Sequence, residues 1–131
     1  MKNILFVASE GVPFIKTGGL ADVVGSLPKY YDKRYFDARV ILPKYMCIKD
    51  EMKSMMQYKT HFYMDFLGQD EYVGVLEAQY DGITYYFIDN EYYFNREGAY
   101  GYPDDGERYA YFAKAILESL VQLGEEPDII A

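Results

Sequence analysis

The hydrophobic residues of the first third of the chain follow two different spacings. Residues 3–8 form a short continuous apolar run, and residues 38–42 form a second one that Pro43 closes. Runs of this length are typical of strands buried in a parallel sheet. Between them, apolar residues recur at helical spacing from about Gly19, and Pro28 should kink or end that helix. The helical stripe consists of Leu20, Val23, Val24, Leu27 and Tyr31. Strand, helix and strand predict a βαβ unit with a right-handed crossover.

The middle of the chain has a strand-like period of two. Residues 58–67 alternate between apolar and polar side chains, which predicts a half-buried strand. The segment Gly68-Gln69-Asp70 should turn the chain. Residues 72–80 and 83–88 are then predicted as strands joined by Asp81-Gly82, a strong signal for a two-residue hairpin. An antiparallel meander is therefore inserted into an otherwise parallel pattern.

The last third begins with a long polar and aromatic loop, residues 89–106. Asp104 and Glu107 resemble a capping box, and a clear helical stripe follows them. Gly124 and Pro127 stop this helix in the expected order. The stripe consists of Tyr109, Phe112, Ala113, Ile116, Leu120 and Leu123. Another apolar strand begins at residues 128–130. Together these patterns predict one α/β domain, and the strand signal at the last residues suggests a piece of a longer protein.

Composition narrows the function classes. The formal net charge of the 131 residues is -8, so a broad nucleic-acid surface, which needs clustered Lys and Arg, is not expected. One cysteine and one histidine make a structural zinc site implausible, and we expect no metal or cofactor. The apolar run at residues 4–8 is too short for a signal segment or a membrane span, which indicates a cytoplasmic protein without membrane contact. The 16 tyrosines could bind sugars or fill the core.

The segment Lys16-Thr17-Gly18-Gly19-Leu20-Ala21-Asp22-Val23-Val24 is the one that points to chemistry. It follows a predicted strand and opens a predicted helix. Amides at a helix N-terminus suit an anion, and glycines let the backbone approach it closely. Lys16 can supply positive charge. These features describe a diphosphate site.

A structural interpretation of the same segment stands beside the functional one. Gly-Gly is common between a strand and a helix, Lys16 could be an ordinary solvated lysine, and Asp22 could be an acid favoured by the helix dipole. The sequence has neither the G-x-G-x-x-G fingerprint nor a Walker loop. The absence of the fingerprint counts against a Rossmann-type oxidoreductase, which is the alternative enzyme class.

Three segments resemble one family of enzymes. Residues 1–29, MKNILFVASEGVPFIKTGGLADVVGSLPK, closely resemble the start of bacterial glycogen synthases and plant starch synthases, and the segment KTGGLADV is highly specific for them. Residues 89–112, DNEYYFNREGAYGYPDDGERYAYF, are similar to the family's aromatic loop and following helix. Residues 39–45, RVILPKY, also fit. The resemblance covers the whole chain and is weakest in the meander.

The resemblance implies a fold and a reaction. It implies the Rossmann-like amino-terminal domain of the glycosyltransferase-B fold, with residues 1–131 as a truncated, acceptor-side part and the carboxy-terminal nucleotide-binding domain absent. The implied donor is ADP-glucose, or UDP-glucose in some relatives, and the acceptor is the non-reducing end of an α-1,4-glucan. Glucose is transferred with retention and without a metal. We expect the isolated piece to be inactive. A stand-alone glucan-binding module is the non-enzymatic alternative.

The resemblance also assigns candidate residues. It implies that Lys16 contacts the donor phosphates, that the Gly18 and Gly19 amides face the diphosphate or the glucose, and that Asp22 lies near the sugar. Tyr93 or Phe94 could stack on a glucose unit of the acceptor, and Arg96 falls in the same loop. Anchoring of the loop to the core is an equally good interpretation of these aromatic residues. No catalytic residue is assigned.

Overall fold

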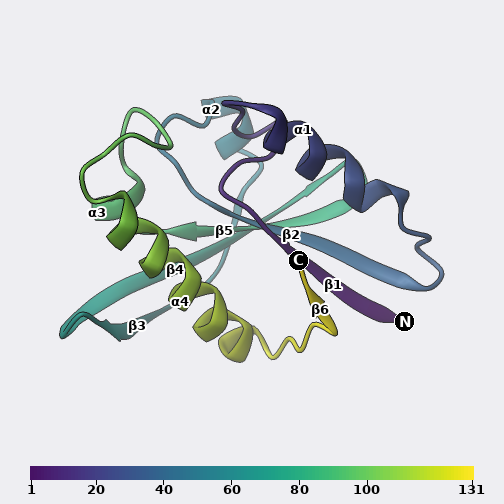
Figure 1. The fold of residues 1–131 in the computed structure, drawn as a ribbon. Helices are drawn as coiled ribbons and strands as arrows, with labels where there is room; N and C mark the ends of the chain where they lie inside the picture. Colours follow the sequence, from purple (N-terminus) through teal and green to yellow (C-terminus); the bar gives the residue numbers. More distant parts are fainter.

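A six-stranded mixed sheet organises residues 1–131, all of which the computed structural model describes (Figure 1). Its strand order is β3-β4-β5-β2-β1-β6. The strands are β1 (Lys2–Val7), β2 (Phe36–Pro43), β3 (Gln57–Phe66), β4 (Gln69–Tyr80), β5 (Ile83–Asp89) and β6 (Ile129–Ile130). The helices are α1 (Gly19–Ser26), a 3-10 turn η1 (Leu27–Tyr30), α2 (Asp50–Lys53), α3 (Glu91–Phe94) and α4 (Asp105–Leu123).

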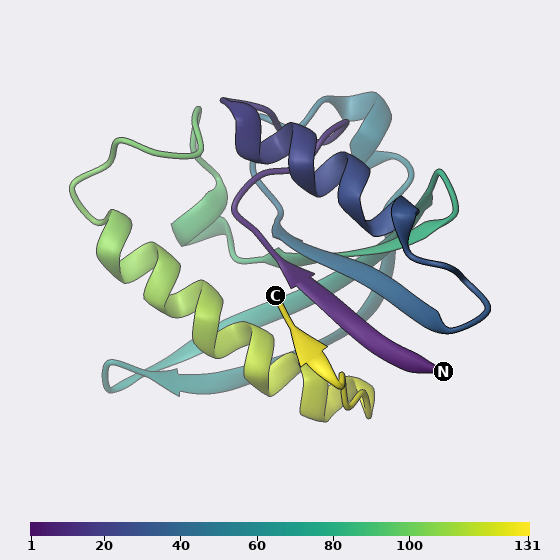
Figure 2. The same cartoon turned by 45° about the vertical axis from the view of Figure 1, so that its right-hand side comes forward.

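The parallel half of the sheet contains β5, β2, β1 and β6. Central strand β2 is covered on both faces, and Val40, Ile41 and Leu42 are at most 1% exposed. Phe14, in the loop before α1, packs on Tyr85 and Phe87 of one face. Helix α4 packs on the other face, so α1 and α4 flank the sheet from opposite sides (Figure 2). The expected mostly parallel α/β sheet is confirmed.

The antiparallel half is the predicted meander of β3, β4 and β5. Asp81 and Gly82 both have positive φ, 51° and 78°, as the Asp-Gly signal predicts. The turn between β3 and β4 uses Leu67 and Gly68, with φ of 52° and 76°. It therefore begins one residue earlier than the expected Gly68-Gln69-Asp70, and Gln69 already belongs to β4.

Helix α1 buries a different stripe from the predicted one. Leu20 and Val23 are 47% and 54% exposed, whereas Ala21, Val24 and Gly25 are buried. The cause is a close approach to the preceding loop: a Cβ on Gly25 would lie 2.2 Å from Cγ2 of Val12. Small residues thus set the contact face. As expected, α1 ends before Pro28, which lies in η1.

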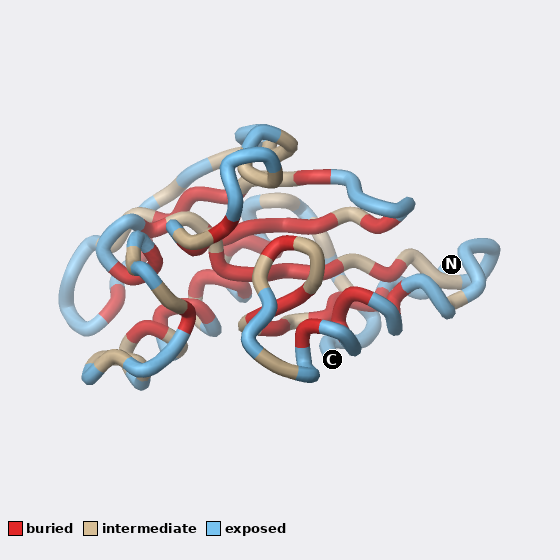
Figure 3. Tube along the Cα trace, turned by 90° about the horizontal axis from the view of Figure 1, so that it is seen from above, coloured by how far each residue is buried: buried red, intermediate tan, exposed pale blue.

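Helix α4 also differs from its predicted start. Asp104 precedes it but makes no capping bond, so the capping box is absent, because Arg96 binds the Asp104 carboxylate instead. The end agrees with the sequence, since Gly124 adopts the left-handed conformation with φ of 68°. The short helices α2 and α3 were not predicted. Figure 3 shows the buried trace concentrated in the central strands. None of the helices combines the length and the hydropathy of a membrane span.

Candidate functional site

The loops that follow β1 and β5 leave the sheet at the same end, where the carboxyl ends of the parallel strands lie. Strands β1, β2 and β5 are parallel, so their carboxyl ends point the same way (Figure 1). In open α/β sheets, ligands bind in the crevice outside these ends. The Gly-Gly segment follows β1 and the aromatic loop follows β5. The topology therefore brings the two candidate regions of the sequence to the same end of the sheet.

A buried carboxylate fixes the shape of the Gly-Gly loop. Glu10 is 3% exposed. Its Oε2 accepts a hydrogen bond from the Thr17 amide at 2.9 Å and another from the Thr17 hydroxyl. Its Oε1 accepts a bond from the Ala21 amide at 3.3 Å, in the first turn of α1. Glu10 thereby links both sides of Gly18-Gly19 and does what an N-cap side chain would do, since Gly18 at that position has none.

The backbone of the two glycines is uncovered at this end of the sheet. A Cβ on Gly19 would meet no heavy atom within 4 Å, and one on Gly18 would meet only Glu10 Oε1, at 3.9 Å. Gly18 has an extended φ of -163°, which any residue can adopt. Neither packing nor conformation therefore requires glycine at these positions, in contrast to Gly25. Close approach of an anion to the helix N-terminus does account for them.

Lys16 and Asp22 lie together beside this helix terminus. Lys16 Nζ is 2.9 Å from Asp22 Oδ2, and the two side chains are 55% and 56% exposed. An exposed pair of this kind contributes about 0–1 kcal/mol. The lysine can therefore exchange its carboxylate partner for another anion at little cost. The structure thus brings together all four residues expected on the donor side: Lys16, Gly18, Gly19 and Asp22.

The aromatic loop is anchored in the core, which corrects the stacking role expected of two residues. Phe94 is fully buried and its ring packs against Tyr45, Tyr111 and Phe112. Tyr93 is 3% exposed and stacks on Tyr111 with ring centroids 4.7 Å apart. Neither ring has a face free for a glucose unit. The periodicity of α3 explains the burial, because this short helix turns the two side chains toward α4.

Two arginines hold the rest of this loop. Arg96 makes a bidentate ion pair with Asp104, with both N–O distances 2.8 Å, so its guanidinium is already occupied. Arg108 is 0% exposed. It donates hydrogen bonds to the carbonyls of Tyr93 at 2.7 Å and Ala99 at 3.0 Å, and its charge pairs with Asp105 at 2.9 Å. Arg108 is therefore a structural clamp between α4 and the loop.

A chain of hydroxyl groups joins the two loops. Tyr100 and Ser9 are hydrogen bonded through their hydroxyls. The Tyr45 hydroxyl lies 2.7 Å from the Ser9 carbonyl, the Tyr109 hydroxyl lies 2.6 Å from the Ala99 carbonyl, and the two hydroxyl oxygens are 2.7 Å apart. Their two protons serve two of these three contacts. Burial raises the pKa of Tyr100 and of Tyr109, so these hydroxyls keep their protons at neutral pH.

Sequence reasoning missed Ser9, Glu10 and Tyr100 as members of the site. Ser9 and Glu10 are the polar residues directly after the apolar β1 run, at the carboxyl end of a parallel strand. That position is itself a signal for a ligand-facing edge. Tyr100 offered no comparable signal, because the loop around it is rich in tyrosine and has no periodicity.

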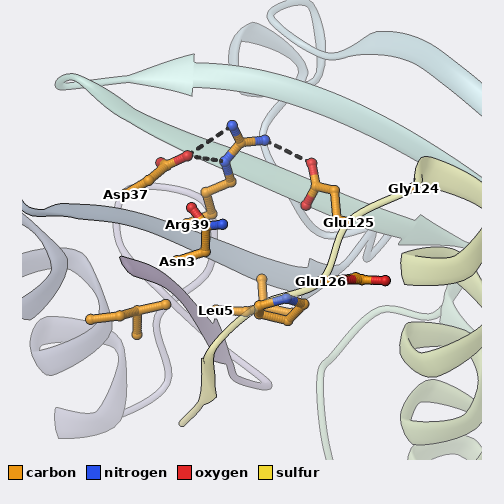
Figure 4. A pocket seen from close by; sticks show the side chains of 9 residues that line it. Asn3, Leu5, Asp37, Arg39, Gly124, Glu125 and Glu126 are labelled. Carbon is orange, nitrogen blue, oxygen red and sulfur yellow. Dashed lines mark hydrogen bonds and ion pairs between the residues drawn. The ribbon is translucent and has the colours of Figure 1, made fainter. Parts of the chain in front are cut away.

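A separate cavity lies near the amino-terminal halves of β1 and β2, beneath the connection from α4 to β6 (Figure 4). Arg39 dominates it and points toward Asp37 and Glu125, at N–O distances of 3.0 and 2.8 Å. These two carboxylates already balance the only cation in the lining. The cavity lies away from the loops after β1 and β5, and we do not assign it to the site.

Comparisons with known proteins agree with this geometry. The family model described as "Starch synthase catalytic domain" matches residues 3–131. Glycogen synthases of Lachnoclostridium phytofermentans and Lachnospira eligens are 60% and 57% identical over 131 residues. Each alignment covers 99% of this chain and 27% of the relative, so the chain spans about a quarter of the relatives' length.

A solved structure matches as well. The catalytic domain of starch synthase IV from Arabidopsis thaliana, bound to ADP and acarbose, superposes with a TM-score of 0.87 and 32% identity. The match covers 98% of this chain and 27% of that chain. The mixed six-stranded sheet is thus the fold found in part of that catalytic domain, and the family match spans nearly all of the residues described above. The chain belongs to the starch synthase catalytic domain family.

Proposed function

We propose that the protein carrying this chain transfers glucose from ADP-glucose to the non-reducing end of an α-1,4-glucan, with retention, in the cytoplasm. The Lys16–Asp22 loop would face the donor diphosphate. The observation that carries this proposal is the open Gly18-Gly19 backbone at the N-terminus of α1, with Lys16 beside it. ADP as the nucleotide is supported by the Arabidopsis relative, which is bound to ADP. UDP-glucose is the alternative donor.

The loop supports an electrostatic role in this reaction. When the glucosyl bond breaks, negative charge grows on the departing diphosphate. Amides and an ammonium that already face that position stabilise the charge without rearrangement. A phosphate oxygen would replace Asp22 as the partner of Lys16, because the exposed ion pair is weak. Asp22 would then be free to accept a hydrogen bond from a hydroxyl of the transferred glucose.

The buried residues of the aromatic loop contribute rigidity to this arrangement. Arg108 and the hydroxyl chain through Tyr45 and Tyr109 tie the loop to the end of β1. Sites on rigid supports keep reacting groups within the narrow geometry that catalysis needs. We therefore infer that Tyr93 and Phe94 act on the glucan only through the position of this loop.

The test is a glucosyl-transfer assay on the protein that carries this chain, with ADP-glucose and UDP-glucose as donors. We expect Lys16→Ala to lower kcat/KM for the donor by about 10- to 100-fold, the scale of one lost charge-assisted hydrogen bond. Lys29→Ala is the matched control, because Lys29 forms a similarly exposed pair with Asp81 at 2.8 Å. Absence of transfer from either donor by the folded protein would refute the function, and normal donor kinetics of Lys16→Ala would refute the role of Lys16.

A further inference from the structure

Strand β3 forms one edge of the sheet, beyond β4, and its outer side pairs with no other strand of the chain (Figure 1). It is ten residues long and contains no proline. Proteins usually shorten such a strand or interrupt it with proline, because its free N–H and C=O groups pair readily with another strand. A long edge without these features is therefore a candidate interaction surface.

The regular part of this edge is symmetric about Tyr63. A bulge interrupts the pairing with β4 between Tyr58 and Thr60, and the turn that follows Phe66 ends the strand. Residues 60–66 lie between these two irregularities, and Tyr63 is their midpoint. Most homo-oligomers have a two-fold axis, across which residue i of one copy meets residue j of the other, and j meets i. An antiparallel pair of β3 edges with its axis at Tyr63 would align the whole of this segment in both copies.

The backbone groups of the edge fit this register. Alternate residues of an edge strand direct both polar groups outward. The turn between β3 and β4 has two residues, so residue 66 bonds to β4. The groups of Asp65, Tyr63 and His61 then point outward, and the Asp65 carbonyl agrees with this direction because it accepts a bond from Lys114 of α4. A carbonyl has two lone pairs, so Lys114 does not block a strand. In a pair about Tyr63, outward groups of one copy meet outward groups of the other.

Side chains on the exposed face of β3 are complementary in the same register. His61 would lie opposite Asp65 of a second copy, with the two Tyr63 rings at the axis, and all of these residues are exposed. Directly opposed side chains have Cβ atoms about 4.5–5.5 Å apart, within reach of a hydrogen bond or an ion pair. Tyr58 is hydrogen bonded to Nδ1 of His61. Nε2 is therefore the nitrogen that can meet a carboxylate.

Asp65 lacks a counter-charge within its own chain. It lies directly opposite Asp70 in the register of β3 and β4. Like charges in this position destabilise a ladder, and neither carboxylate forms an ion pair. Lys59 of the same strand pairs with Glu77 at 3.3 Å. An imidazole from a second copy would supply the partner that Asp65 does not have.

The opposite face of β3 is only partly covered by α4. Thr60 and Phe62 are half-buried, whereas Met64 and Phe66 are buried. In the register about Tyr63, Phe62 of each copy lies beside Met64 of the other, and Thr60 lies beside Phe66. The pairing would therefore join the less covered half of one strand to the better covered half of its partner, which continues the apolar face across the axis.

We propose that two copies of the protein that carries this chain associate through their β3 edges, antiparallel about Tyr63, with His61 of each copy opposite Asp65 of the other. The two sheets then form one continuous sheet across a two-fold axis. A second copy is the occupant because the edge is complementary to itself. The inference is independent of the proposed function, since none of these residues lies in the candidate site.

The test exchanges charges across the axis. His61→Asp sets carboxylates opposite one another at two places in the dimer, and Asp65→Lys sets lysines opposite histidines. Each variant should weaken dimerisation about tenfold or more in sedimentation velocity. At about 0.15 M salt the general repulsion between two copies of charge -8 is screened, whereas closely opposed pairs still interact. An equimolar mixture of the two variants should associate, because each introduced lysine then lies opposite an introduced aspartate.

Controls separate the register from net charge and from folding. Gln122→Glu and Glu126→Lys make the same changes of charge at exposed positions away from β3, and both should associate like the wild type. Urea titrations verify that each variant folds. His61→Lys keeps a cation opposite Asp65 and should tighten the dimer about three- to tenfold, so it tests the register even if His61→Asp fails to fold. In hydrogen exchange, the amides of His61, Tyr63 and Asp65 should gain protection as the wild-type concentration rises.

Three outcomes would overturn the proposal. The first is a wild-type protein that stays monomeric up to about 100 μM, which would mean that the β3 edge has another partner or none. The second is a dimer that neither charge variant weakens, which would place the interface elsewhere. The third is a mixture of folded variants that does not associate, together with a His61→Lys dimer no tighter than the wild type.

Discussion

Replacing Glu10 with Gln tests how the candidate loop is held. The substitution keeps the size of the side chain and removes its charge. Glu10 uses both oxygens, with Oε2 accepting from the amide and hydroxyl of Thr17 and Oε1 accepting from the Ala21 amide. Glutamine has one carbonyl oxygen and one NH2 group. It can therefore serve either Thr17 or Ala21, and its NH2 group must face the other donor.

The cost follows from these contacts. If the glutamine oxygen faces Thr17, two charge-assisted bonds become neutral ones, which loses about 1 kcal/mol. The Ala21 amide then loses its bond to the side chain, which costs about 1 kcal/mol, but it keeps its bond to the Gly18 carbonyl at 3.3 Å and is not left unsatisfied. Together we expect the loop and the first turn of α1 to lose about 1–2 kcal/mol of local stability. That range corresponds to about 5- to 30-fold more frequent opening.

Hydrogen exchange measures this opening directly. The amides of Thr17 and Ala21 should lose protection by that factor in Glu10→Gln, while amides in the central strands keep theirs, because the change is local. In transfer assays, donor kcat/KM should fall although Lys16 and the glycines are intact. Glu97→Gln is the control, since Glu97 is exposed in the aromatic loop.

Unchanged exchange at Thr17 and Ala21 would refute the reasoning, since Glu10 would then contribute nothing to the order of the loop. A loss of protection spread over the whole sheet would also contradict it. Such a result would show that Glu10 supports the global fold and not the Gly-Gly loop in particular.

Three further substitutions test the neighbouring features. Gly19→Ala should leave the denaturation midpoint unchanged, because its Cβ meets nothing within 4 Å, but should weaken donor use in transfer assays; normal donor kinetics would argue against close approach of an anion. Arg108→Met should destabilise the fold by about 3–5 kcal/mol in urea titrations, because it removes a buried cation from Asp105 and two carbonyls; a change below 1 kcal/mol would refute the clamp. Burial raises the pKa of Asp89 in the folded state, so its ionisation opposes folding as the pH rises above about 4. Asp89→Asn should therefore stabilise the protein at pH 7 and do so less at pH 4.5, and a gain that is equal at both pH values would contradict this assignment.

The sequence by itself determined the elements whose signals are local. Asp81-Gly82 predicted its hairpin, because both residues tolerate the positive φ that the turn needs. Gly124 predicted the end of α4 for the same reason. The apolar runs predicted the parallel strands, and Gly-Gly before a helix predicted an open N-terminus with Lys16 beside it. In each case the backbone preference of a few adjacent residues carries the information.

Tertiary structure decided which side chains are free. Tyr93 and Phe94 could equally have faced a ligand or the core, and contact with α4 settled this, since burying a ring is worth more than leaving it in water. Asp104 could have capped α4, but Arg96 offers it two charge-assisted bonds. The exposure of Leu20 and Val23 depended on the approach of Val12 to Gly25. The role of Glu10 depended on a loop that folds back over it. These outcomes are set by partners distant in the sequence, and a local pattern carries no record of them.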